Sequence, residues 1–165
     1  MTSEHLLHTI PPIYDGNSKI LILGSFPSVK SREVSFYYGH PQNRFWRVLV
    51  AVLGCAVPSS NEEKTALLQS HNIALWDVIK SCDIVGSSDS SIKNVVPNDI
   101  GVILSSCGIR QIYSNGKTSE KLFNKYIKDT VGRDTVALPS TSPANASYNL
   151  ERLTDSWSVI KNNIR

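Results

Sequence analysis

The stretch Ile20-Leu21-Ile22-Leu23-Gly24 decides the fold. Consecutive apolar residues that end at a glycine are typical of a strand covered on both faces, as in a parallel sheet. Shorter patterns predict further strands over residues 73–76, 111–114 and 135–138. The chain therefore offers a set of strands that could form one parallel sheet.

Helical patterns lie between these predicted strands. A helix is predicted over residues 43–53, because Phe45, Trp46, Leu49 and Val52 recur at helical spacing and Gly54 can adopt the left-handed conformation that ends a helix. The sequence SSNEE from residue 59 contains two overlapping capping boxes, which predict a helix running toward residue 71. The same arguments predict a short helix near residues 100–104, a helix over residues 118–127 and a carboxy-terminal helix over residues 150–160.

Strands that alternate with helices predict parallel β-α-β units with right-handed crossovers. We therefore expect an α/β fold, a three-layer α/β/α sandwich with a central four-stranded parallel sheet. A chain of 165 residues is long enough for one core, so residues 1–165 are expected to form a single domain. The serine-rich segment 81–98 is expected to be a functional loop rather than a linker. Because ligands bind at the carboxyl ends of such strands, loops beginning at Gly24, Asp77, Asn115 and Pro139 should converge on one cleft.

The composition narrows the functional classes only slightly. A formal net charge of +3 is a weak indication of polyanion binding. Cys55, Cys82 and Cys107 are odd in number and far apart, which predicts neither a disulfide framework nor a zinc site. We expect no metal and no other cofactor. No apolar run is long enough to cross a bilayer, so a cytoplasmic location without membrane contact is expected.

Two loops at predicted strand ends carry recognisable motifs. The first reads GSFPS over residues 24–28 and continues as YYGHPQNRFW over residues 37–46, and the second reads LPSTSPANA over residues 138–146. GSFPS resembles the GQDPYH and GINPG motifs of the uracil-DNA glycosylase superfamily, and HPQNRFW resembles the HPANRFW stretch of its mismatch-specific members. The second loop resembles HPSPLS or NPSGLS. With WDVI from residue 76 and GSSDSSI from residue 86, the chain is most like the hypoxanthine-DNA glycosylase branch.

The resemblance implies an enzyme that flips a deaminated base, hypoxanthine, out of DNA and hydrolyses its N-glycosidic bond. Phe26 stands where other members have the Asp or Asn that positions water, and Leu138 stands where the uracil enzymes have a catalytic His. The hypoxanthine branch shares this pattern, which implies that Asn43 is the catalytic residue. We hypothesise that its carbonyl oxygen orients the attacking water. The alternative is that Asn43 only caps the following helix.

The same resemblance suggests how the base is held. Tyr38 occupies the place of an aromatic that stacks on the base, although it could be an ordinary loop aromatic. Asp77 stands where the uracil enzymes read the base with an Asn, and a carboxylate there would accept from N1–H of hypoxanthine. Asp77 could instead cap a helix beginning at Val78. Ser25 and Phe26 complete the predicted base-binding set.

DNA contacts are expected from the two motif loops and from one helix start. Short hydroxyl side chains beside prolines suit phosphate binding, and the resemblance implies that role for Ser140. The stretch from Pro143 to Asn145 should enter the minor groove, while His40 is expected to shape its loop. Lys117 could meet a phosphate near a helix amino terminus. The predicted DNA-binding residues are Pro27, Ser28, Ser140, Thr141, Ser142, Pro143, Asn145 and Lys117.

Since neither motif loop contains a lysine nucleophile, we predict base removal without backbone cleavage. The expected partner of a monomeric protein is double-stranded or single-stranded DNA that contains a deaminated base. A uracil-directed or G:U/G:T mismatch-directed glycosylase is an alternative within the same class. A non-catalytic DNA-binding module is an alternative from another class, because both usual catalytic positions are replaced.

Overall fold

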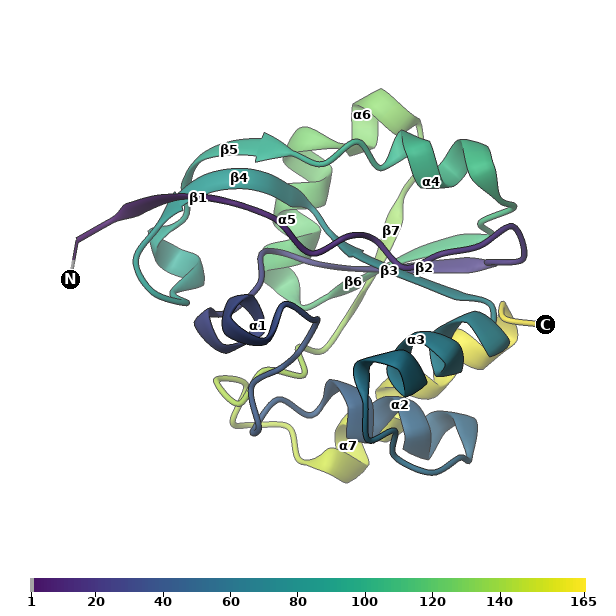
Figure 1. Cartoon of the computed structure of the whole chain (residues 1–165). Coiled ribbons are helices and arrows are strands. Elements are labelled where there is room, and N and C mark those ends of the chain that lie inside the picture. The colour runs from purple at the N-terminus through teal and green to yellow at the C-terminus, as the bar shows by residue number, and fades with distance from the viewer. Residues whose placement is uncertain (1) are drawn as a thin grey trace.

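The central sheet has the predicted strands in parallel. The computed structural model describes residues 2–165, and in it the strands follow the order β3-β2-β6-β7 (Figure 1). Their bounds are β2 (Ile20–Gly24), β3 (Ile73–Asp77), β6 (Gln111–Asn115) and β7 (Thr135–Leu138). Ile20 pairs with Ile73 on one side and with Gln111 on the other, so β2 lies inside the sheet. The prediction of a four-stranded parallel sheet is confirmed.

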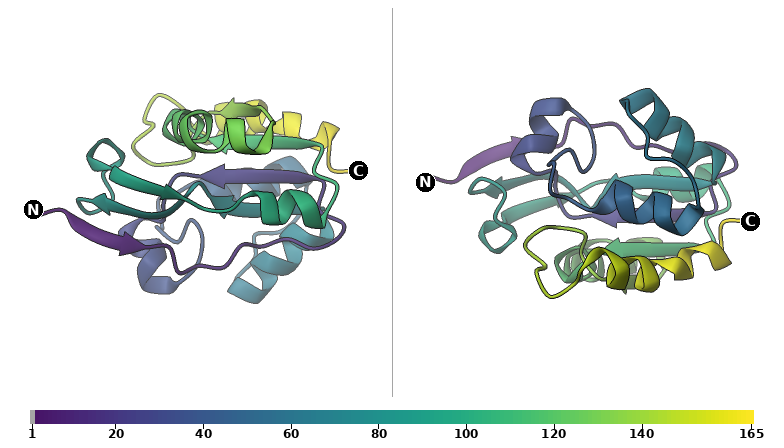
Figure 2. Two further views of the ribbon diagram at one scale, coloured as in Figure 1. Left: turned by 90° about the horizontal axis from the view of Figure 1, so that it is seen from above. Right: turned by 90° about the horizontal axis from the view of Figure 1, so that it is seen from below.

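The two faces of β2 contact two separate helical layers. Ile20 and Ile22 belong to a core cluster with residues of α2 (Phe45–Leu53), α3 (Asn61–Ser70) and α7 (Leu150–Trp157). Leu21 and Leu23 belong to a second cluster with residues of α4 (Gly101–Ser106) and α5 (Lys117–Tyr126). All of these β2 side chains are fully buried, which explains the unbroken apolar run. Figures 1 and 2 show the resulting three layers, α/β/α.

The segment 81–98 is not the loop expected from its composition. It contains most of β4 (Ile79–Ile84), all of β5 (Lys93–Pro97) and the short 3-10 helix η1 (Asp89–Ser91). With β1 (Glu4–Leu7), these strands form an antiparallel sheet in the order β1-β4-β5. Ile79, Cys82 and Ile84 enter the second core cluster, while Lys80 is exposed and Asp83 is partly exposed. An antiparallel strand with one solvent-exposed face contains many polar residues, so its composition resembles that of a loop. The expectation of a loop was therefore wrong.

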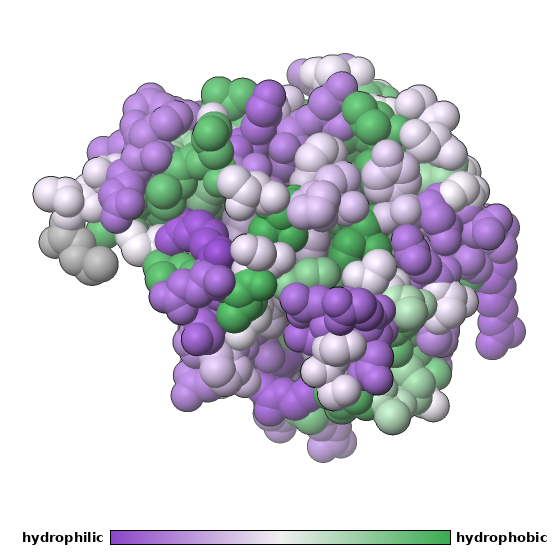
Figure 3. Space-filling view, viewed as in Figure 1, coloured by the Kyte–Doolittle hydropathy of each residue, from purple (hydrophilic) through white to green (hydrophobic). Residues whose placement is uncertain are grey.

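The remaining elements are short or terminal. They are α1 (Val29–Val34), α6 (Lys128–Val131) and the 3-10 helix η2 (Ser158–Asn162). Ser60 caps α3 by accepting from Glu63 N–H, and the Glu63 carboxylate accepts from the N–H of Ser59, one residue before the N-cap, in a variant of the predicted capping box. On the face seen in Figure 3, polar and apolar residues are interspersed. Among residues 2–165, no helix is both long and apolar enough to cross a membrane.

Candidate active site

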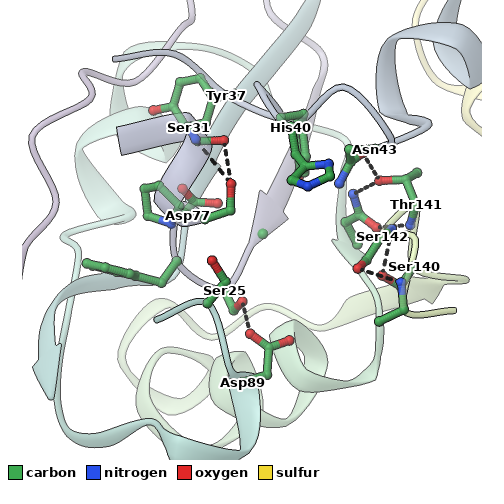
Figure 4. Close-up of a pocket in the computed structure, with 18 of the residues that line it drawn as sticks. Ser25, Ser31, Tyr37, His40, Asn43, Asp77, Asp89, Ser140, Thr141 and Ser142 are labelled. Atoms are coloured by element: carbon green, nitrogen blue, oxygen red, sulfur yellow. Dashed lines mark hydrogen bonds between the residues drawn. The ribbon is translucent and has the colours of Figure 1, made fainter. Parts of the chain in front are cut away.

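A cavity of about 390 Å³ opens at the carboxyl edge of the central sheet. Gly24, Asp77 and Asn115, the last residues of β2, β3 and β6, line it, and Ser140 joins them from the loop after β7. The expected convergence of these loops is therefore confirmed. Figure 4 shows Asp77 and Ser25 on one side of the cavity and Asn43 with the second motif loop on the other.

Most of the predicted site residues line this cavity. They are Ser25, Phe26, Pro27, Ser28, Tyr38, Asn43, Asp77, Ser140, Thr141, Ser142 and Pro143. Asn145 and Lys117 lie outside the lining. The Asn145 amide is used within its own turn, since it donates to Ser140 O and accepts from Ser147 Oγ. Lys117 is exposed at the first position of α5, beside Gly116.

The Asn43 side chain joins the start of α2 to the second motif loop. Its Oδ1 accepts from the backbone N–H of Phe45 and from the hydroxyl of Thr141, each at 2.9 Å. Thr141 in turn bonds Asn115 twice: its Oγ1 accepts from Asn115 Nδ2, and its N–H donates to Asn115 Oδ1. Asn43 precedes the N-cap residue Arg44, and its side chain both binds the first N–H of α2 and lies in the cavity wall, so the helix-start role and a site role are not exclusive.

The direction of every hydrogen bond in this network is fixed by backbone donors. A backbone N–H can only donate, so Phe45 N–H identifies the oxygen of Asn43 and Thr141 N–H identifies the oxygen of Asn115. Asn115 must then donate to Thr141 Oγ1, whose own proton goes to Asn43 Oδ1. Both acceptor positions of Oδ1 are used. Within residues 2–165, the Nδ2 group of Asn43 donates to no partner and is left for a ligand.

Asp77 forms a buried pair with a residue that the sequence analysis missed. His8 Nε2 lies 2.8 Å from Asp77 Oδ2, and the two side chains are only 1% and 6% exposed. The His8 ring packs edge-on against Phe26 and contacts Tyr37. No helix begins at Val78, because β4 follows directly at Ile79, so the helix-cap alternative for Asp77 is wrong.

Tyr38 is held in an unusual conformation with its ring on Phe45. Its backbone φ is +53°, in the left-handed region, and the two rings stack with centroids 4.1 Å apart. Its hydroxyl is buried and has no hydrogen-bond partner within residues 2–165. Burial, together with the nearby charge of Asp77, raises the pKa of the phenol, so the hydroxyl keeps its proton; the Asn115 side chain opposes that rise.

Phe26 and Asp89 form the opposite rim. The Phe26 ring lies between His8 and the guanidinium of Arg32, whose Cζ is 5.7 Å from the ring centroid. Asp89, from η1, lies 3.4 Å from Ser25 Oγ and lines the cavity. Desolvation raises the pKa of Asp89 and the charge of Asp77 adds to the rise, while the hydroxyls of Ser25 and Thr118 oppose it. Asp89 lies in the GSSDSSI stretch that carries part of the family resemblance, but the sequence analysis does not single it out as a site residue.

Arg44 holds the second motif loop in place. Its guanidinium and Nε donate to the carbonyl oxygens of four loop residues, which are Thr141, Ser142, Asn145 and Tyr148. Pro143 and Ala144 are exposed at the tip of this loop. His40 Nδ1 accepts from Gln42 N–H and so shapes the first motif loop, as predicted. No group of three or more potential metal-ligating side chains comes together anywhere in residues 2–165.

The cavity can hold a planar base taken out of a duplex. It has one carboxylate at its floor, amide and hydroxyl groups on its walls, and a position at the carboxyl edge of a parallel sheet. With the two motif loops at its mouth, this arrangement defines a DNA glycosylase. The chain belongs to the uracil DNA glycosylase superfamily, whose family model matches residues 11–162.

Named relatives and a solved structure agree with this assignment. A hypoxanthine DNA glycosylase of Methanosarcina barkeri is 36% identical over 137 residues, which cover 82% of this chain and 85% of the relative. A protein of the same name from Methanosarcina acetivorans is 34% identical over 152 residues, covering 91% and 94%. The solution structure of a candidate uracil DNA glycosylase from Methanosarcina acetivorans superposes with a TM-score of 0.79 at 33% identity, covering 92% of this chain and 94% of that one.

Proposed function

We propose that this protein removes hypoxanthine from DNA by hydrolysing the bond between the base and the sugar. The position of Asn43 carries the proposal: the resemblance to the hypoxanthine branch assigns the reaction to this amide, and its free Nδ2 group faces the cavity. Two relatives that match most of the chain bear the name hypoxanthine DNA glycosylase. The substrate is double-stranded DNA, with single strands as an alternative, and the protein acts as a cytoplasmic monomer.

The Nδ2 group of Asn43 stabilises negative charge on the departing base. Breaking the glycosidic bond makes the sugar cationic and the base anionic, so the reaction needs fixed dipoles more than covalent chemistry. Since Oδ1 already accepts two hydrogen bonds, it has no free lone pair with which to orient the attacking water. The donor role is the one that the side chain can still perform.

The attacking water needs an acceptor elsewhere, and we assign that role to Asp89. Phe26 has no polar atom at the position where other members hold the water. Asp77 already bonds His8 and faces the base, whereas the Asp89 carboxylate lines the cavity beside Ser25. A carboxylate in this cavity repels the phosphates of DNA, so its presence needs a functional reason. Stabilising the cationic sugar in the transition state is such a reason.

Hydroxyl groups of the motif loops bind the DNA backbone. Ser140 Oγ and Ser142 Oγ each accept from a backbone N–H within the loop, which leaves their protons free to donate to phosphates. Ser28 caps α1 by accepting from Ser31 N–H. The exposed tip at Pro143 enters the minor groove, and Arg44 keeps the tip in shape. Thr141 acts indirectly, because its hydroxyl is committed to Asn43.

Excision assays with a panel of bases test this function. Duplexes with a single hypoxanthine, xanthine or uracil, and a G:T mismatch, are incubated with excess protein and then treated with alkali to reveal abasic sites. We expect hypoxanthine to be released first, with no strand cleavage before alkali. Faster release of uracil or thymine would assign the chain to the mismatch-directed alternative. Tight binding without release of any base would favour a non-catalytic module.

A further inference from the structure

Two polar atoms at the floor of the cavity have no partner within residues 2–165. One is the hydroxyl of Tyr38, which is buried and makes no hydrogen bond. The other is Oδ1 of Asp77, since this carboxylate bonds His8 through Oδ2. Buried polar groups are nearly always paired in folded proteins, so the unpaired Tyr38 hydroxyl, in a binding cavity that also contains a carboxylate oxygen without a hydrogen bond, indicates a group that a ligand satisfies.

Both atoms lie close to Gly24. A Cβ placed at Gly24 would come within 2.4 Å of Asp77 Oδ1 and within 3.0 Å of the Tyr38 hydroxyl. The absence of a side chain at this strand end therefore allows both groups to reach the same spot. One group donates a proton and the other accepts one, so together they present a donor beside an acceptor.

His8 fixes the acceptor of this pair. Its Nε2 lies 2.8 Å from Asp77 Oδ2, and its backbone N–H donates to Lys80 O in β4, which anchors the segment after β1. Phe26 and Tyr37 pack against the imidazole on two sides. The carboxylate can hardly rotate, because one oxygen is held by a buried ring, and the other oxygen therefore has a defined direction.

We propose that Tyr38 and Asp77 read the lactam edge of a flipped base and that His8 is the positioning residue for this reading. A lactam edge has a carbonyl oxygen next to a ring N–H, as in hypoxanthine, xanthine and uracil. The phenol donates to the carbonyl and the carboxylate accepts from the N–H. Adenine and cytosine carry the opposite pattern, an amino group beside an unprotonated ring nitrogen, and would leave both protein groups unpaired. The inference rests on the proposed function and names the chemical feature that this site selects.

The test compares hypoxanthine with unsubstituted purine, a bicycle of the same shape that lacks both the carbonyl oxygen and the ring N–H. Single-turnover rates and equilibrium binding are measured for each base, using duplexes with a non-cleavable 2′-fluoro sugar for binding. The wild-type protein should prefer hypoxanthine in both measurements. Tyr38→Phe should lower the hypoxanthine-to-purine ratio about tenfold, the size expected for one hydrogen bond. Its thermal stability should not fall, because the hydroxyl has no partner to lose.

Two His8 variants separate positioning from packing. In His8→Gln the amide can still donate to Asp77 Oδ2, so we expect it to keep most of the base preference. His8→Leu fills similar space without a donor and should lower the hypoxanthine-to-purine ratio by about tenfold. Tyr126→Phe, in α5 outside the cavity lining, is the matched control for removing a phenol oxygen.

The outcomes distinguish this inference from the proposed function. An unchanged ratio in a stable Tyr38→Phe protein overturns the inference, as does a His8→Leu protein that slows both bases by the same factor. Equal binding of the two bases by the wild type overturns it as well. Preferential binding of hypoxanthine without any excision contradicts the proposed function alone and supports the reading of the lactam edge.

Discussion

Replacing Asn43 with aspartate separates the two roles of its side chain. An aspartate keeps an oxygen where Oδ1 now accepts from Phe45 N–H and from the Thr141 hydroxyl, each at 2.9 Å. Asp and Asn are about equally good residues at helix amino termini, so the start of α2 should be preserved. The variant loses the Nδ2 donor and gains a negative charge, whereas Asn43→Ala loses the cap and the donor together.

The expected loss follows from what one positioned donor contributes. Removing a single amide donor that stabilises developing negative charge slows an enzyme by about 10²–10³, or ~2.7–4 kcal/mol of the barrier. We expect Asn43→Asp to slow hypoxanthine excision by that factor while changing the free energy of unfolding by less than about 0.5 kcal/mol. Asn43→Ala should slow the reaction similarly and also lower the free energy of unfolding by about 0.5–2 kcal/mol.

Single-turnover excision and urea unfolding, measured on the same preparations, provide the two numbers. Asn124→Ala, on the exposed side of α5, is the control for loss of an amide away from the cavity. The donor role would be refuted by an Asn43→Asp protein that excises hypoxanthine within about threefold of the wild-type rate. Asn43 would then be a helix cap that merely lies beside the cavity.

Three further substitutions test the surrounding site. Asp89→Asn should slow excision at least about tenfold and remove the acidic limb of the pH–rate profile. Because the pKa of Asp89 is raised, this limb should lie at higher pH than is usual for an aspartate. An unchanged profile would show that Asp89 does not bind the attacking water. A lysine at position 44 cannot keep the four carbonyl contacts, so Arg44→Lys should raise KM for duplex DNA about tenfold with a smaller change in kcat. The control Arg47→Lys, at an exposed position near the start of α2, should leave KM unchanged. Gly24→Ala should displace Asp77 and cut the preference for hypoxanthine over purine at least about tenfold, whereas Gly16→Ala, with open space around it, should behave as wild type.

The sequence predicts the central sheet because buried parallel strands leave a local signature. Residues 20–23 are apolar at every position, and their neighbours on both faces are helices, so no solvent-facing residue interrupts the pattern. The helix predicted over residues 43–53 begins instead at Phe45, with Arg44 at the N-cap position, and the Asn43 side chain accepts from the Phe45 N–H. The position of the cavity followed from topology alone, since parallel strands end at one edge.

The missed parts depend on contacts between distant segments. β4 and β5 have one solvent-exposed face and are joined by a serine-rich connection, so their composition resembles that of a loop. His8 lies 69 residues before Asp77 in the chain, and no local pattern links them. Asn115 was expected at the cleft as the start of a loop, because it ends β6 at the edge where the other strands end, but it was not predicted to be a site residue. Its role depends on the hydrogen bonds that it makes with Thr141, and no local sequence pattern predicts those bonds.

The two unusual residues of the site, Phe26 and Asp77, depend on each other. An acid at position 26 would add a third carboxylate to a cavity that already contains Asp77 and Asp89, and like charges at short range oppose one another's ionisation. Phe26 instead packs its ring against His8 and helps to keep water from the pair that His8 makes with Asp77. Where water is excluded, the hydrogen bond between His8 and Asp77 Oδ2 is stronger, so Asp77 Oδ1 keeps a defined direction. With Phe26 in the first motif loop, the carboxylate that we assign to the attacking water comes instead from Asp89 in η1, and Asp77 is left as a rigid acceptor beneath the base.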